Sequence, residues 1–152
     1  AMLFNVLSYL SDKLLTEGNT VAALDELYIW LSDNVAVGTT IIEYIRNCLK
    51  RVRKKESAML LASQNLEDFN QEGIRELTKP LFAIPPHQFL FNAGAVDKKF
   101  YMEALQLEES EYNLIRFPQR GVCLYRCGNE RYLLEVHAPA YKEALFGKAG
   151  GR

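Results

Sequence analysis

Two adjacent carboxylates directly follow a short apolar run near the start of the chain. The run is TVAAL, residues 20–24, and the carboxylates are Asp25 and Glu26. A continuous apolar run is typical of a buried strand in a parallel sheet, whose ligands collect beyond the carboxyl ends of the strands. There the first carboxylate can help to hold magnesium on nucleotide phosphates, and the second can deprotonate an attacking water. The alternative is structural: Asp25 caps the following turn, and Glu26 is a solvated residue of that turn.

A second apolar run, SAMLLASQ at 57–64, ends in Ser63 and Gln64. Between the two runs, apolar residues recur at helical spacing from Val37 to Val52. Two strands joined by one long helix form a right-handed crossover with parallel strands, so Gln64 is expected beside the two carboxylates. It can bond the lytic water or the terminal phosphate there, or it can simply cap the NLEDF turn.

The basic run KRVRKK, residues 50–55, has three interpretations. Cations at the end of a helix are stabilised by the helix dipole without any ligand. A nucleic-acid stripe is the second interpretation, although the run lacks interleaved aromatic residues. The third is an arginine finger that stabilises the phosphates of a neighbouring subunit's nucleotide.

The sequence contains no GxxxxGK[ST] phosphate loop. Its nearest glycine-lysine pair, Gly147-Lys148, has no predicted strand before it and no helix after it. Without the backbone amides of such a loop, the 152 residues carry half of a nucleotide site.

The other elements follow from periodicity and turn residues. They are a helix over 2–16, a short helix over 73–79 that stops before Pro80, a third core strand at 87–93, helices over 97–105 and 108–115, a hairpin with strands at 121–127 and 130–137 around Gly128-Asn129, and a closing helix over 140–146 before the GKAGGR tail. We expect a single domain over residues 1–152, because no linker divides the chain.

Composition excludes little else. The formal net charge of -1 gives no global reason to expect binding to nucleic acid or anionic membranes, and no apolar run approaches a membrane span. Cys48, Cys123 and Cys127 form no CxxC pair, which favours a reduced compartment. His87 and His137 lack ligand-like spacing, so we interpret both as structural or surface residues.

The order of the motifs resembles one known family. FNVLSYL, LDELYIWL, RVRKK, LLASQNLEDF and a terminal hairpin followed by EALFGKAGGR resemble the C-terminal part of the VirB-type conjugative transfer ATPases. These are RecA-like motors of type IV secretion systems, related more distantly to septal DNA translocases. The resemblance covers nearly the whole chain, and SQNLEDF is its most specific element.

The resemblance implies an α/β fold: a partial RecA-like P-loop NTPase core with a mainly parallel sheet flanked by helices, plus a C-terminal β-hairpin. It assigns Asp25 to magnesium and Glu26 to the catalytic carboxylate of the Walker B motif. Gln64 matches the polar sensor, and Arg53 and Lys54 match a basic pair that includes the candidate finger. ATP and Mg²⁺ are the implied cofactors of the full-length parent.

The family also implies partners and a location. These are other subunits of the same ATPase, hexameric in full-length members, and other components of the secretion channel, with DNA left open. The implied location is cytoplasmic, at the inner face of the membrane through the secretion complex. Because the Walker A loop and the family's N-terminal domain are absent, the chain looks like an inactive fragment. Two alternatives are a docking module with a degenerate site and a translocase or helicase fragment whose KRVRKK run grips DNA.

The missing loop has a consequence for the sheet. In this family the strand that feeds the phosphate loop lies beside the sensor strand, here 57–63, which would be left with unpaired backbone groups. The chain can compensate by pairing residues 87–93 with 57–63, or by pairing the edges of two copies. We favour self-association, because the absent strand also exposes apolar surface.

Overall fold

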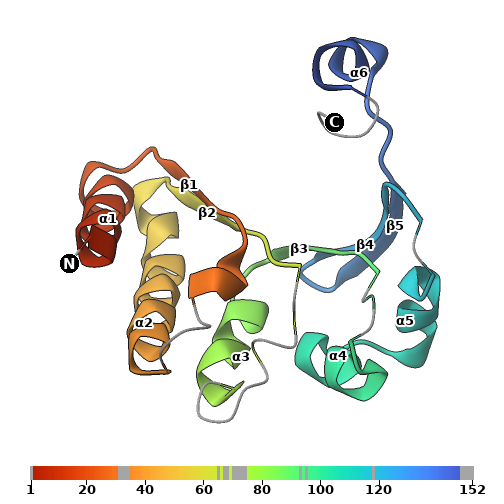
Figure 1. The fold of residues 1–152 in the computed structure, drawn as a ribbon, viewed down its shortest axis with the longest axis horizontal. Coiled ribbons are helices and arrows are strands. Elements are labelled where there is room, and N and C mark those ends of the chain that lie inside the picture. Colours follow the sequence, from red (N-terminus) through yellow and green to blue (C-terminus); the bar gives the residue numbers. More distant parts are fainter. Residues whose placement is uncertain are drawn as a thin grey trace. The chain divides into compact units, whose positions relative to one another are not determined.

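The computed structural model describes residues 2–30, 35–64, 66, 69, 75–92, 94, 96–117 and 119–147. They form two compact units (Figure 1), one over Ala1–Pro85 with Val96–Gln106 and one over Pro86–Ala95 with Leu107–Arg152. The α/β class is confirmed, since helices and strands alternate through the chain. The assignment of residues 1–152 to one RecA-like portion stays a prediction.

The first unit begins with the expected N-terminal helix. Helix α1, Met2–Asp12, continues into η1, a π-helical turn at Lys13–Glu17. Gly18 ends it with a φ of 79°, a conformation that favours glycine, and its N–H donates to the Lys13 carbonyl. A Cβ at Gly18 would lie 2.7 Å from the Lys55 carbonyl oxygen, so only glycine lets these two segments approach so closely.

The predicted crossover is confirmed. Strand β1, Val21–Leu24, pairs in parallel with β2, Ala58–Leu61, and Val21 lies opposite Ala58. Between them the described residues form three helical segments: η2 at Leu27–Trp30, α2 at Val35–Arg51 and η3 at Val52–Lys55.

One face of this strand pair is buried against the helices. The buried residues of the main core are Leu7, Leu24, Leu27, Ile41, Ile42, Ile45, Phe69 and Leu81. They come from α1, from the carboxyl end of β1 and the η2 segment after it, from one stripe of α2, and from the chain after β2, so burial of apolar area helps to fix where the carboxyl end of β1 lies.

The prediction of a helix that stops before Pro80 is wrong. Helix α3, Arg75–Ala83, contains Pro80, and residues 73 and 74 of the predicted helix lie outside the described part. Proline removes one backbone hydrogen bond from a helix. Here the following turn still forms, because Leu81 is buried in the core and the Ile84 N–H donates to the Pro80 carbonyl. Packing of the apolar face outweighs the lost hydrogen bond.

Helix α4, Lys98–Leu105, completes the first unit and has the predicted position. Asp97 caps it, with its side chain accepting a hydrogen bond from the Phe100 N–H at 2.8 Å. Phe100, Tyr101 and Leu105 are buried on its inner face.

The described residues of the second unit form an antiparallel sheet and two helices. Its strands are β3, His87–Leu90, β4, Val122–Cys127, and β5, Glu130–Glu135, in that order across the sheet, and its helices are α5, Glu109–Ile115, and α6, Ala140–Phe146. The hairpin turning at Gly128-Asn129 is confirmed.

The third predicted strand does not pair with residues 57–63, the partner considered from the sequence. Strand β3 pairs antiparallel with β4, Phe89 lying opposite Tyr125, so it does not fill the edge beside β2. Consequently β1 and β2 are the parallel pair among the described strands, and the other pairs are antiparallel. Stacking of Phe89 on Tyr125, with ring centroids 4.7 Å apart, helps to fix β3 against the hairpin.

The cysteines differ in accessibility. Cys48 and Cys123 are buried, and burial raises the pKa of both thiols, so little thiolate is present at pH 8. Cys127 is only half-buried. We expect one thiol to react rapidly with a disulfide reagent in the folded protein, and the other two at least about tenfold more slowly until denaturant is added. Reaction of all three at one rate would contradict the burial of Cys48 and Cys123.

Candidate functional site

The carboxyl ends of β1 and β2 are joined by backbone hydrogen bonds beyond the strands themselves. The Ala62 N–H donates to the Leu24 carbonyl at 2.9 Å, and the Leu27 N–H donates to the Ala62 carbonyl at 3.0 Å. Asp25 and Glu26 lie between Leu24 and Leu27, so both carboxylates are held at the end of β2. Sequence reasoning predicted this shared edge from the parallel pairing alone.

Glu26 and Gln64 are in direct contact there. The Gln64 side chain donates from Nε2 to Glu26 Oε1 at 2.8 Å, although 38 positions separate the two residues. The other oxygen, Oε2, is shielded from solvent and has no hydrogen-bond partner among the described residues. A shielded polar atom without a partner is uncommon in folded proteins. The alternative in which Glu26 is merely solvated does not fit this geometry.

The backbone of Glu26 is in a conformation that non-glycine residues rarely adopt. Its φ is 51°, in the left-handed region, which costs a non-glycine residue about 1–2 kcal/mol. Among the described residues, three other non-glycine residues share this sign of φ, and two of them end helical segments: Glu56 after η3 and Gln106 after α4. Glu26 instead lies between a strand and η2, where the turn directs its side chain toward Gln64. No signal in the sequence predicted this strain.

Asp25 lies beside this pair and is more exposed. Its Oδ1 accepts a hydrogen bond from the Glu26 N–H at 2.9 Å, which agrees in part with the predicted capping role. An exposed carboxylate retains lone pairs for a hydrated cation. No group of three or more histidine, cysteine or acidic side chains in the described ranges could hold a metal ion by itself. Any cation at Asp25 would therefore keep most of its ligands from water or a bound phosphate, as magnesium usually does.

Arg53 and Lys54 are not brought to this end of the sheet. They lie on η3, before β2 begins, and both are exposed. Strand β2 separates them from Gln64 by at least about 13 Å at ~3.3 Å per residue. Within one chain these two cations cannot contact the Glu26–Gln64 pair.

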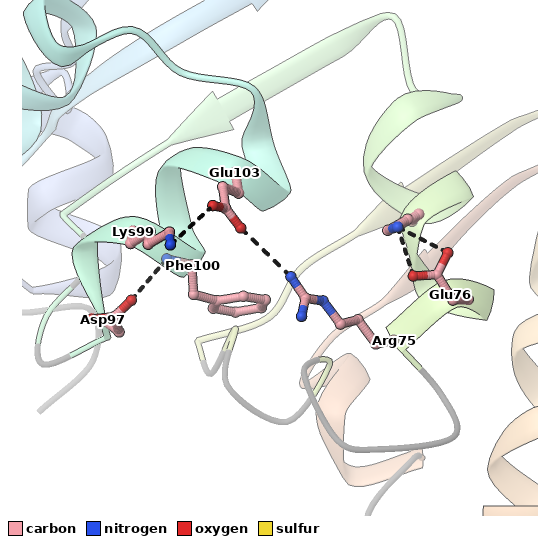
Figure 2. Close-up of polar contacts among 7 residues, drawn as sticks. Arg75, Glu76, Asp97, Lys99, Phe100 and Glu103 are labelled. Carbon is pink, nitrogen blue, oxygen red and sulfur yellow. Dashed lines mark hydrogen bonds and ion pairs between the residues drawn. The ribbon is translucent and has the colours of Figure 1, made fainter.

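A second polar cluster joins α3 to α4 (Figure 2). Arg75 lies 3.6 Å from Glu103, which also contacts Lys99 at 4.0 Å, and Lys79 pairs with Glu76 on α3. At least half of each of these side chains is exposed, so the pairs contribute little free energy and form no enclosed site. The cluster connects two helices of the first unit and offers no group for catalysis.

A solved structure resembles this chain over most of its length. The structure of VirB4 of Thermoanaerobacter pseudethanolicus matches this chain with a TM-score of 0.79 and 27% sequence identity. The match covers 92% of this chain and 37% of that chain. The predicted resemblance to VirB-type ATPases is confirmed. Over most of its length the chain is similar to one part of this VirB4, and its partial RecA-like fold is confirmed with it.

The similarity to VirB4 rests on the structure. No protein-family model matches the sequence, and no curated protein matches it significantly. Helices in the described part of the chain are not both long and apolar enough to cross a membrane.

Proposed function

We propose that this chain supplies the Walker B and sensor half of the ATP-hydrolysing site of a type IV secretion motor. The observation that supports it most is the Glu26–Gln64 contact at the shared end of two parallel strands. Similarity to VirB4 over 92% of the chain supports the same assignment. The complete motor, assembled with other subunits and channel components at the cytoplasmic face of the membrane, is part of this proposal.

Each residue has a distinct role in the proposed site. Asp25 helps to hold hydrated Mg²⁺, which neutralises charge on the phosphates of ATP when both are bound. Glu26 orients the attacking water and accepts its proton. Gln64 holds Oε1 of Glu26 and so fixes the carboxylate. Arg53 or Lys54 stabilises transition-state charge at the nucleotide of a neighbouring subunit, because neither reaches the site in its own chain.

Because the 152 residues contain no phosphate loop, the test compares the chain alone with a chimera that supplies the loop. We expect the purified chain to bind Mg·ATP weakly and to show negligible hydrolysis, because no backbone amides cradle the β-phosphate. A chimera in which residues 2–147 replace the matching segment of the Thermoanaerobacter VirB4 should hydrolyse ATP. Phosphate release measured on both proteins checks this. Robust hydrolysis by the chain alone, abolished by Glu26→Gln, would contradict the proposal that this chain supplies only half of the nucleotide site.

A DNA-translocating role is the second candidate, because all five cations of KRVRKK are exposed. Binding of this chain to DNA that weakens with salt, and is lost when the run is neutralised, would favour that candidate. A chimera that folds and binds nucleotide yet hydrolyses none would favour a docking module instead.

A further inference from the structure

The basic turn η3 is held in place by the residues that follow η1. The Asn19 N–H donates a hydrogen bond to the Lys55 carbonyl at 3.0 Å. A Cβ at Gly18 would lie 2.7 Å from the same carbonyl oxygen, so the Gly18 backbone is packed directly against the end of η3. The turn is also closed on itself, because the Ser57 N–H donates to the Val52 carbonyl at 3.1 Å.

Side-chain hydroxyls add to this contact. The Thr20 N–H donates to Ser57 Oγ at 3.2 Å, and the Thr20 hydroxyl donates to the Gly18 carbonyl at 2.8 Å. The Ser57 hydroxyl in turn lies 3.3 Å from the Lys55 carbonyl. These four residues together with Asn19 are called the amino-end clamp below, because they join the chain before β1 to the chain before β2.

Two residues of this region have backbone conformations that non-glycine residues rarely adopt. The φ of Asn19 is 49° and that of Glu56 is 53°. Left-handed conformations are unfavourable for residues with a Cβ, and they persist where the surrounding structure determines them. Here the hydrogen bond from Asn19 and the close approach of Gly18 supply that constraint. The chain therefore maintains a strained and closely fitted joint at the base of the basic turn.

Two cations of η3 lie away from its packed side. Val52 is buried, and a 3₁₀ helix has about three residues per turn, so Lys55 follows on the same side. Arg53 and Lys54 lie on the other sides, and both are exposed. Of the two, arginine is better suited to a phosphate group, because its planar guanidinium can donate two parallel hydrogen bonds.

We propose that the amino-end clamp, through the close contact of Gly18 with the Lys55 carbonyl, positions Arg53 for the nucleotide of a neighbouring subunit. This inference rests on the proposed function, because it requires a site that is completed between subunits. The strand pair β1–β2 then carries Glu26 of one site at its carboxyl end and the arginine for the next site at its amino end. Such an arrangement suits a ring whose subunits contact each other head to tail.

Replacing Gly18 by alanine in the VirB4 chimera tests the fit. The new Cβ would lie at 2.7 Å from a backbone oxygen, whereas ordinary contacts begin at 3.4 Å, so η3 would have to shift. A displacement of this kind at a reacting group is costly, and we expect hydrolysis at saturating ATP to fall about tenfold or more. Nucleotide affinity should stay within about twofold, because the carboxylates lie at the opposite end of the strands.

The matched control is Gly94→Ala. Gly94 also has a left-handed φ, of 62°, but a Cβ there meets nothing within 4 Å. This variant carries the backbone penalty of the substitution without the collision. Its hydrolysis rate should stay within about twofold of the parent chimera.

Mixing of variants separates positioning from loss of structure. Glu26→Gln removes the proposed base and keeps the clamp, whereas Gly18→Ala keeps the base. When equal amounts mix at random, about a quarter of the interfaces join an intact Glu26 to an intact clamp. Two variants that are each nearly inactive should therefore recover about a quarter of the parent rate together.

Ser57→Ala provides a milder change for the case in which Gly18→Ala does not fold. It removes one hydroxyl from the clamp and adds no atom that collides. We expect a loss of about threefold or more, and a rise in hydrolysis per intact Glu26 when this variant is mixed with Glu26→Gln.

The outcomes distinguish this inference from the proposed function. If the parent chimera hydrolyses ATP, unchanged hydrolysis by the folded clamp variants would overturn the inference alone. A loss of hydrolysis that mixing does not recover would do the same, because the clamp would then be merely structural. A parent chimera without hydrolysis would overturn the proposed function and this inference with it.

Discussion

Replacing Glu26 by glutamine is expected to lower ATP hydrolysis by the VirB4 chimera about 10²–10⁴-fold. The substitution keeps the size of the side chain and leaves a carbonyl oxygen to accept the hydrogen bond from Gln64. It removes the one property that the proposed mechanism requires, which is the capacity to take a proton from water. Single-turnover phosphate release, measured beside nucleotide binding, separates loss of chemistry from loss of affinity.

The matched control is Glu43→Gln. Glu43 is an exposed carboxylate on α2, outside the strand ends, and its substitution removes the same charge from the same unit. We expect its hydrolysis rate to stay within about twofold of the parent, as for surface changes in general. If Glu26→Gln lowered nucleotide affinity and left turnover unchanged, Glu26 would be a binding residue and the role of general base would be wrong.

The shared edge of Glu26 and Gln64 could be predicted because it depends on pattern and topology together. Two apolar runs, each followed by polar residues and joined by one amphipathic helix, permit few arrangements other than a parallel crossover. Such a crossover brings the carboxyl ends together whatever the details of packing. This is why residues 38 positions apart were expected in proximity, and the hydrogen bond confirms it.

Other features depend on interactions that the local sequence does not contain. Pro80 predicted a helix end, but burial of Leu81 and Phe82 against the core carries α3 through it. The strand at His87–Leu90 begins where predicted but is shorter than the predicted 87–93, and its partner depended on Tyr125, which lies 36 residues after Phe89 and stacks on it. The left-handed φ of Glu26 accompanies the hydrogen bond from the Leu27 N–H to the carbonyl of Ala62, the residue after β2. In each case a tertiary contact overrides or completes a local preference.

The SQNLEDF motif combines a polar residue at the site with an aromatic residue in the core. Phe69 is 2% exposed and packs edge-to-face on Phe82, with ring centroids 5.4 Å apart. Its carbonyl accepts a hydrogen bond from the buried Thr78 hydroxyl, and its N–H donates to the Leu66 carbonyl. Asn65, Glu67 and Asp68 of the predicted NLEDF turn lie outside the described residues. The described contacts show that Phe69 is anchored in the core five residues after Gln64.

We therefore expect Phe69→Ala to lower the free energy of unfolding of the first unit by about 3–5 kcal/mol. A loss of this size approaches the whole stability of many small domains, so much of the unit would unfold at 37 °C. Urea denaturation followed by the fluorescence of Trp30, the only tryptophan and a residue of this unit, measures it. Phe4→Ala is the control, because Phe4 is 52% exposed on α1 and its loss should change stability by less than about 0.5 kcal/mol.

Phe69→Leu separates the two functions of the motif. Leucine refills most of the cavity, so the unit should stay folded with a loss of only about 1–2 kcal/mol. In the chimera, this variant should then keep most of its ATP hydrolysis, because the backbone bonds to Leu66 and Thr78 do not depend on the aromatic ring. Loss of hydrolysis in a folded Phe69→Leu protein would instead show that the ring positions Gln64, and the aromatic residue of SQNLEDF would then serve the site as well as the core.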